Sequence, residues 1–80
     1  MDEIATKLAT YISKEILKQP NREMTPEEKL ISSGLVDSFS LIDIGLFIED
    51  NFGVHIDNTE LNADTFDNLG QLSALIRSRQ

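Results

Sequence analysis

Apolar residues near the start of the chain recur at the spacing of an amphipathic helix. They fall once per turn, at Ile4, Leu8, Ile12 and Ile16. This period predicts a helix over residues 4–16 with one buried stripe. Lysines lie on the opposite side, and we interpret them as a solvated face. The helix should end before Pro20, because the residue before a proline avoids the α region.

A second helix is predicted from about Ser38 to Asn51, with Asp37 as its N-cap and Gly53 as its left-handed end. The stripe that should face the core consists of Leu41, Ile44, Ile48 and Phe52. A broad face rotated away from it holds Ser38, Phe39, Ile42, Asp43, Leu46, Glu49 and Asp50. Apolar side chains rimmed by charges are typical of recognition surfaces. Alternatively, Ile42 and Leu46 pack beneath a loop. Gly45, in the middle of this helix, suggests close packing of a neighbouring element.

Capping signals divide the rest of the chain. Residues 25–28, Thr-Pro-Glu-Glu, form a capping-box pattern that predicts a helical turn to about Ile31, inside a long connection from residue 19 to 37. The Asp-Asn-Thr-Glu run at residues 57–60 predicts a short helix that ends near Asn62. Asp67 or Asn68 should begin the last helix. Its apolar stripe consists of Leu69, Leu72, Leu75 and Ile76.

The pattern as a whole predicts an all-α protein. No segment alternates with a period of two, so no strand is expected. The three main helices, one or two short helices and a long first loop fit a single domain over residues 1–80. This length excludes a doubly wound nucleotide-binding sheet and a (β/α)₈ barrel.

The charge is acidic and unevenly distributed. The chain has 14 Asp and Glu against 7 Lys and Arg, a net charge of −7. No Lys or Arg occurs from residue 30 to 76, a stretch that carries eight acids. This balance argues against a nucleic-acid partner and favours a protein with a positive surface. We expect a cytoplasmic protein, since no secretion signal or membrane span is visible.

Candidate chemistry is sparse. The chain has no cysteine, which excludes disulfides, thiol nucleophiles and Cys-ligated metals. His55 is the only histidine, and we expect it to be exposed or locally hydrogen-bonded rather than part of a triad or metal site. Ser38 lies at a helix start, where backbone N–H groups and the helix dipole would stabilise an attached anion. By position alone, however, a serine in a first turn is ordinary.

Three segments change this interpretation. Residues 34–43 are Gly-Leu-Val-Asp-Ser-Phe-Ser-Leu-Ile-Asp and open an acidic second helix. Residues 51–57, Asn-Phe-Gly-Val-His-Ile-Asp, follow that helix, and residues 65–69, Thr-Phe-Asp-Asn-Leu, precede the last one. With the helix spacing and the length, these segments resemble the acyl carrier proteins over nearly the whole chain.

The resemblance implies a small acyl-carrier-like four-helix bundle whose third helix is short. It implies that Ser38 carries 4′-phosphopantetheine, transferred from coenzyme A by a phosphopantetheinyl transferase, and that Asp37 matches the aspartate beside the modified serine. The thiol of the group would hold an acyl or aminoacyl cargo as a thioester. The protein would not be an enzyme. Loading and transfer enzymes with basic surfaces would dock on the second helix, at Phe39, Asp43, Leu46, Glu49 and Asp50.

Three positions depart from the family pattern. Phe39 replaces a common Leu, and Ser40 and Asn51 replace common acids. These differences favour a carrier in specialised metabolism or aminoacyl transfer over bulk fatty-acid synthesis. We expect the protein to be a monomer. The alternative hypothesis is an unmodified acidic helical adaptor that uses the same face to bind a basic protein.

Overall fold

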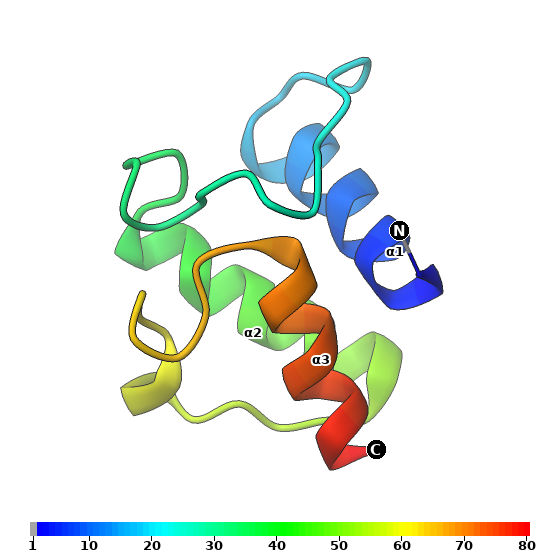
Figure 1. Cartoon of the computed structure of the whole chain (residues 1–80), viewed down its shortest axis with the longest axis vertical. Coiled ribbons are helices and arrows are strands. Elements are labelled where there is room, and N and C mark those ends of the chain that lie inside the picture. Colours follow the sequence, from blue (N-terminus) through cyan, green and yellow to red (C-terminus); the bar gives the residue numbers. More distant parts are fainter. Residues whose placement is uncertain (1) are drawn as a thin grey trace.

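The computed structural model describes residues 2–80 and is all-helical (Figure 1). Its elements, in chain order, are α1 (Glu3–Tyr11), the π-helical turn η1 (Ile12–Ile16), α2 (Ser38–Phe52), the 3₁₀ turn η2 (Asn58–Glu60) and α3 (Leu69–Arg79). No strand occurs in this described part of the chain. The predicted all-α class and the three main helices are therefore confirmed.

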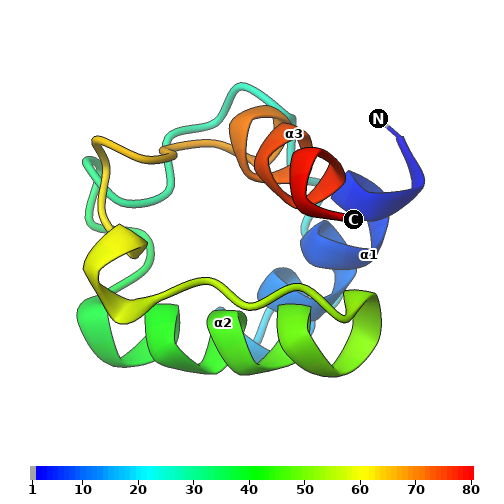
Figure 2. The same cartoon turned by 90° about the horizontal axis from the view of Figure 1, so that it is seen from below.

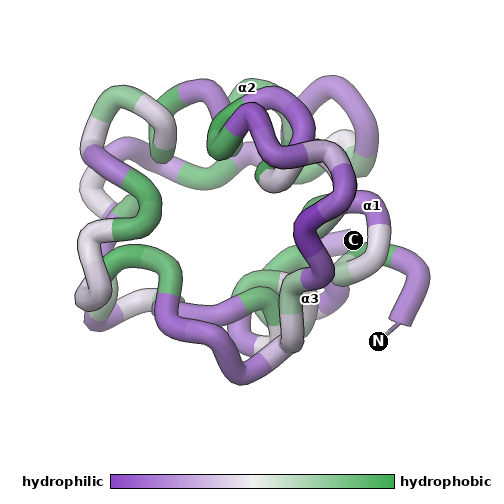
Figure 3. The backbone as a smooth tube through the Cα atoms, turned by 90° about the horizontal axis from the view of Figure 1, so that it is seen from above, coloured by the Kyte–Doolittle hydropathy of each residue, from purple (hydrophilic) through white to green (hydrophobic). Residues whose placement is uncertain are grey.

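The helices enclose one apolar core. Figure 2 shows α2 running along one side of the molecule and α3 on the opposite side, with α1 reaching from beside α3 towards α2. The chain after α2 turns back along it towards η2. Within each turn of α2 the backbone changes between hydrophobic and hydrophilic residues (Figure 3). The largest fully buried apolar side chains are Phe66, Leu8, Ile12, Leu30, Ile44, Ile48, Leu69, Leu72 and Ile76. Burial of this set is the main stabilising contribution to the fold.

The first helix has the predicted extent, but its last turn is wider than an α-turn. Asp2 caps α1 through the backbone N–H of Ala5 at 2.7 Å. In η1 the N–H of Leu17 donates to the carbonyl of Ile12 at 2.8 Å, which is the i to i−5 spacing of a π-helix. The chain then turns away through Lys18, which has a φ of 56°.

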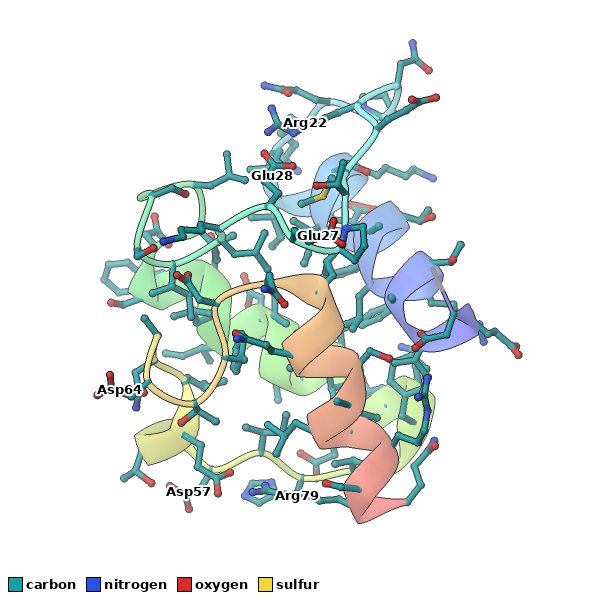
Figure 4. The ribbon with its side chains drawn as sticks, in the orientation of Figure 1. Arg22, Glu27, Glu28, Asp57, Asp64 and Arg79 are labelled. Carbon is teal, nitrogen blue, oxygen red and sulfur yellow. The ribbon has the colours of Figure 1, made fainter. Side chains whose placement is uncertain are left out.

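The predicted helical turn over residues 25–31 is wrong. Residues 25–28 form one hydrogen-bonded turn and no helix, with the Glu28 N–H donating to the Thr25 carbonyl at 3.3 Å. The Glu28 side chain pairs with Arg22 instead of closing a capping box, and the two side chains lie together in Figure 4. Two residues further on, the amide of Leu30 donates to the carbonyl of Asp67 at 2.7 Å. Tertiary partners therefore take the groups that a local helix would have used.

The other caps agree with the sequence. Asp57 accepts the Thr59 N–H at 3.0 Å, and the Glu60 carboxylate accepts the Asp57 N–H at 3.2 Å, so η2 has its capping box. η2 ends at Glu60, two residues before the predicted end. Of the two candidates for the start of the last helix, Asn68 is the N-cap, since its side chain accepts the Gln71 N–H at 2.7 Å.

Candidate functional site

The start of α2 is built by one capping residue. Asp37 has extended backbone angles, and its Oδ1 accepts the backbone N–H of Ser40 at 2.8 Å. Its carbonyl accepts the N–H of Leu41 at 3.0 Å, the first intrahelical bond. The Ser40 amide is the main cause that holds the pKa of Asp37 below its usual value. Asp37 is therefore an anion at neutral pH that caps the first turn of α2.

Ser38 is the first residue of α2, and its side chain is exposed. The first backbone N–H groups of a helix have no intrahelical partner, and the helix dipole adds positive potential there. The only backbone hydrogen bond to the Asp37 side chain that meets normal geometry comes from Ser40. A negatively charged group joined to the Ser38 hydroxyl would thus lie at the end of the helix that stabilises it.

The outer face of α2 carries the three large apolar side chains that remain exposed in the described residues. The exposed fractions are 82% for Phe39, 46% for Ile42 and 56% for Leu46. The alternative, in which Ile42 and Leu46 pack beneath a loop, is therefore wrong. The acids around this apolar centre are also exposed, namely Asp43, Glu49 and Asp50. The structure brings together every residue that the sequence had assigned to this face.

Two side chains from neighbouring segments reach the rim of this face. The Tyr11 hydroxyl lies 3.5 Å from the backbone carbonyl of Asp43, and its ring stacks on Phe47 with centroids 4.1 Å apart. His55 is exposed and lies beside Glu49, with Nδ1 3.5 Å from Oε2. The expected local role of His55 is thereby confirmed. Among residues 2–80 no cluster of three or more potential ligands could hold a metal ion.

Asp67 is a residue near this site whose contacts the sequence did not indicate. The pattern offered it only as a possible helix cap. In the structure its carboxylate accepts backbone N–H groups from residues 31 and 32, in the connection that leads to Asp37. Its partners lie 36 and 35 residues away. No periodicity or capping pattern reports a contact over that separation.

Comparison with known proteins identifies the class. The family model described as the phosphopantetheine attachment site matches residues 6–76, and the chain belongs to this family. The acyl carrier protein of Thermobifida fusca (strain YX) is 37% identical over 59 residues, which cover 74% of this chain and 73% of that protein. No solved structure matches. The chain is an acyl carrier family member, so it is a carrier rather than an enzyme and has 4′-phosphopantetheine as its covalent cofactor.

The chemistry at the start of α2 fits this cofactor. The group attaches through a phosphate, and the exposed Ser38 hydroxyl at a helix N-terminus offers both the oxygen and the stabilising field. The chain itself has no cysteine, so a thiol must come from the cofactor. No helix of residues 2–80 combines the length and the apolar character needed to cross a bilayer.

Proposed function

We propose that Ser38 is the attachment point of 4′-phosphopantetheine and that the protein presents acyl or aminoacyl thioesters to partner enzymes. The observation that carries this proposal is the exposed Ser38 hydroxyl in the Asp37-capped first turn of α2. This turn lies inside the segment that matches the attachment-site family. When bound, the cofactor supplies the thiol on which cargo is held.

The chain's own residues prepare this attachment. The Ser38 oxygen is accessible to a phosphopantetheinyl transferase because it lies on the surface rather than in a cleft. Asp37 stabilises the first turn of α2 by capping the Ser40 N–H. Its negative charge lies beside Ser38, where the metal and basic groups of the transferase would act. The first-turn amides then stabilise the phosphodiester that results.

The outer face of α2 is the proposed docking surface. Its apolar centre consists of Phe39, Ile42 and Leu46, and its acidic rim of Asp43, Glu49 and Asp50. No Lys or Arg occurs between residues 30 and 76, so the whole surrounding stretch favours a basic partner. Loading and transfer enzymes would bury the apolar centre and place cations against the rim.

The pathway proposal rests on three side chains at the site. Phe39 is a large exposed aromatic residue directly after the serine. Ser40 and Asn51 occupy positions at which fatty-acid carriers commonly have an acidic residue. A partner must therefore accept a bulkier and less acidic surface at these positions. We propose a monomeric carrier that works in the cytoplasm, in specialised metabolism or aminoacyl transfer.

The test is the intact mass after incubation with coenzyme A and a broad-specificity phosphopantetheinyl transferase. We expect the wild-type protein to gain one phosphopantetheine group and Ser38→Ala to gain none, with an unchanged helical circular dichroism spectrum. Ser40→Ala is the matched control, because it removes a hydroxyl two residues further along the same turn and should still be modified.

Two results would count against the proposal. A mass gain by Ser38→Ala would place the attachment elsewhere. No mass gain by the wild-type protein would favour the unmodified acidic adaptor, which would use the same α2 face without any group on Ser38.

A further inference from the structure

The carboxylate of Asp67 holds the segment that leads to Ser38. Oδ1 accepts the backbone N–H groups of Ile31 and Ser32 at 2.8 and 2.9 Å. Oδ2 accepts the Ser32 hydroxyl at 2.5 Å, and the Asp67 carbonyl accepts the Leu30 N–H at 2.7 Å. One residue thus satisfies four donors from three consecutive residues.

These bonds continue towards the helix start. The carbonyl of Leu30 accepts the N–H of Val36 at 2.9 Å, and Val36 is the residue before Asp37. The side chains of Leu30 and Val36 are buried in the core, with 1% and 3% exposed. The connection from residue 30 to 36 is therefore a closed loop whose two ends are joined and whose first three residues are bound to Asp67.

Asp67 is itself fixed. Its backbone N–H donates to the Gln71 side chain at 2.7 Å, in the first turn of α3, and the preceding Phe66 is 1% exposed. The Ser32 hydroxyl is the main cause that holds the pKa of Asp67 below its usual value, with the Ser32 and Ile31 amides adding to it. The carboxylate is therefore charged at neutral pH. It links the start of α3 to the loop before α2.

We propose that Asp67 is a positioning residue for modification at Ser38: its carboxylate pre-orders residues 30–36, so that a phosphopantetheinyl transferase meets a loop already in its docked shape. This inference rests on the proposed attachment to Ser38. The loop lies at the Ser38 end of α2 (Figure 1), where a transferase must approach. A loop that is mobile before docking must be ordered during docking, and that entropy loss weakens the encounter.

The test compares transferase kinetics on four proteins. Asp67→Ala removes all three side-chain bonds, and we expect its KM as a transferase substrate to rise about tenfold while kcat changes less than about twofold. Asp67→Asn keeps the acceptor for the two amides, and its NH₂ group can donate to the Ser32 oxygen, so we expect rescue to near the wild-type KM. Asp64→Ala removes an equal charge from an exposed residue in the same connection between η2 and α3 (Figure 4) and should behave as wild type.

The outcomes separate the two proposals. If the wild-type protein is not modified, the attachment proposal fails. If it is modified and Asp67→Ala has the wild-type KM, the positioning role fails. A KM as poor for Asp67→Asn as for Asp67→Ala, or a loss in Asp64→Ala, would also overturn it, because charge would then be the cause.

Asp67→Glu serves if the alanine variant loses its helical signal. It keeps the charge but displaces the carboxylate by one methylene, so the same rise in KM is expected. Hydrogen exchange gives a second readout in the wild-type protein and in Asp67→Glu. The Ile31 and Ser32 amides should exchange faster in the variant, while the core amides of α3 keep their protection. Unchanged exchange at both amides would contradict the proposal.

Discussion

Glu60 and Arg79 form an ion pair of two parallel hydrogen bonds that ties η2 to the last turn of α3. Arg79 Nη1 donates to Glu60 Oε2 at 2.7 Å and Nη2 donates to Oε1 at 2.8 Å. The same carboxylate closes the capping box of η2 through the Asp57 N–H. Figure 4 shows Arg79 and Asp57 near each other at this end of the molecule. The pair therefore holds the short turn that lies over α2 in Figure 2.

Removal of this pair should weaken the fold in a salt-dependent way. We expect Arg79→Gln to lower the melting temperature at low ionic strength, and by less at high ionic strength, because salt screens partly exposed charges. The loss should be smaller than that from truncating a core residue. Thermal unfolding followed by circular dichroism at low and high ionic strength measures the change in melting temperature. Lys14→Gln, which removes an exposed cation from η1, is the control; equal losses in the two variants would contradict a specific role for the pair.

The Glu60 carboxylate should also make the stability of the fold sensitive to acid. The Arg79 side chain holds the pKa of Glu60 below its reference value of 4.5. A pKa that is lower in the folded than in the unfolded state stabilises the fold above pH 4.5, and this contribution is lost as the pH falls through the folded pKa. We expect Glu60→Gln to be less stable at neutral pH and to lose less stability on acidification. Urea unfolding at a series of pH values tests this; parallel pH curves would contradict it.

Gly45→Ala should stabilise the protein. The sequence suggested close packing at Gly45, but an added Cβ would meet the nearest atom, Leu61 Cδ1, at 3.8 Å, an ordinary van der Waals distance. Alanine should therefore gain about 1 kcal/mol from helix propensity without a clash. Gly53→Ala is the matched control: with a φ of +67° it should lose about 1 kcal/mol. Urea unfolding gives both values, and a destabilised Gly45→Ala would show that the space at Leu61 is needed.

Tyr11 should titrate above its usual range. Burial is the main cause that raises its pKa from 10.0, and the Asp43 and Glu15 charges raise it further. It is the only tyrosine and there is no tryptophan, so tyrosinate absorbance reports this group alone. We expect a midpoint above 10.0, which Asp43→Asn moves partly back. Because the unfolded chain loses this proton first, stability should fall as the pH rises past 10.0.

Charge reversal on α2 should impair docking without unfolding. Asp43→Lys and Glu49→Lys place a cation in the rim that is proposed to meet a basic partner. We expect each to lower kcat/KM for the phosphopantetheinyl transferase by about tenfold at low salt, and by less at high salt. Glu23→Lys reverses an exposed acid in the connection between η1 and α2 and serves as the control. Rates that are equal for all three variants would contradict the α2 face.

The short-range signals of the three main helices and of η2 were reliable in this protein. The stripe at Leu41, Ile44 and Ile48 is buried, and Asp37 and Gly53 cap α2 as the sequence indicated. Such signals depend on contacts within one or two turns, which residue spacing records directly. The serine at the start of α2, the acids beyond it and the overall acidic charge are likewise properties of the chain itself.

Only the tertiary structure decided the rest, because it depends on residues far apart in the chain. The Thr25 to Glu28 pattern does not become a helix, since Arg22 pairs with the Glu28 side chain and the Gly70 N–H donates to the Pro26 carbonyl. Whether Ile42 was exposed or covered depended on where the loops lie, which periodicity does not report. The role of Asp67 arises from bonds across more than thirty residues. The sequence thus determined the helices, their caps and the candidate serine, whereas the packing of distant segments determined the shape of the loop that precedes it.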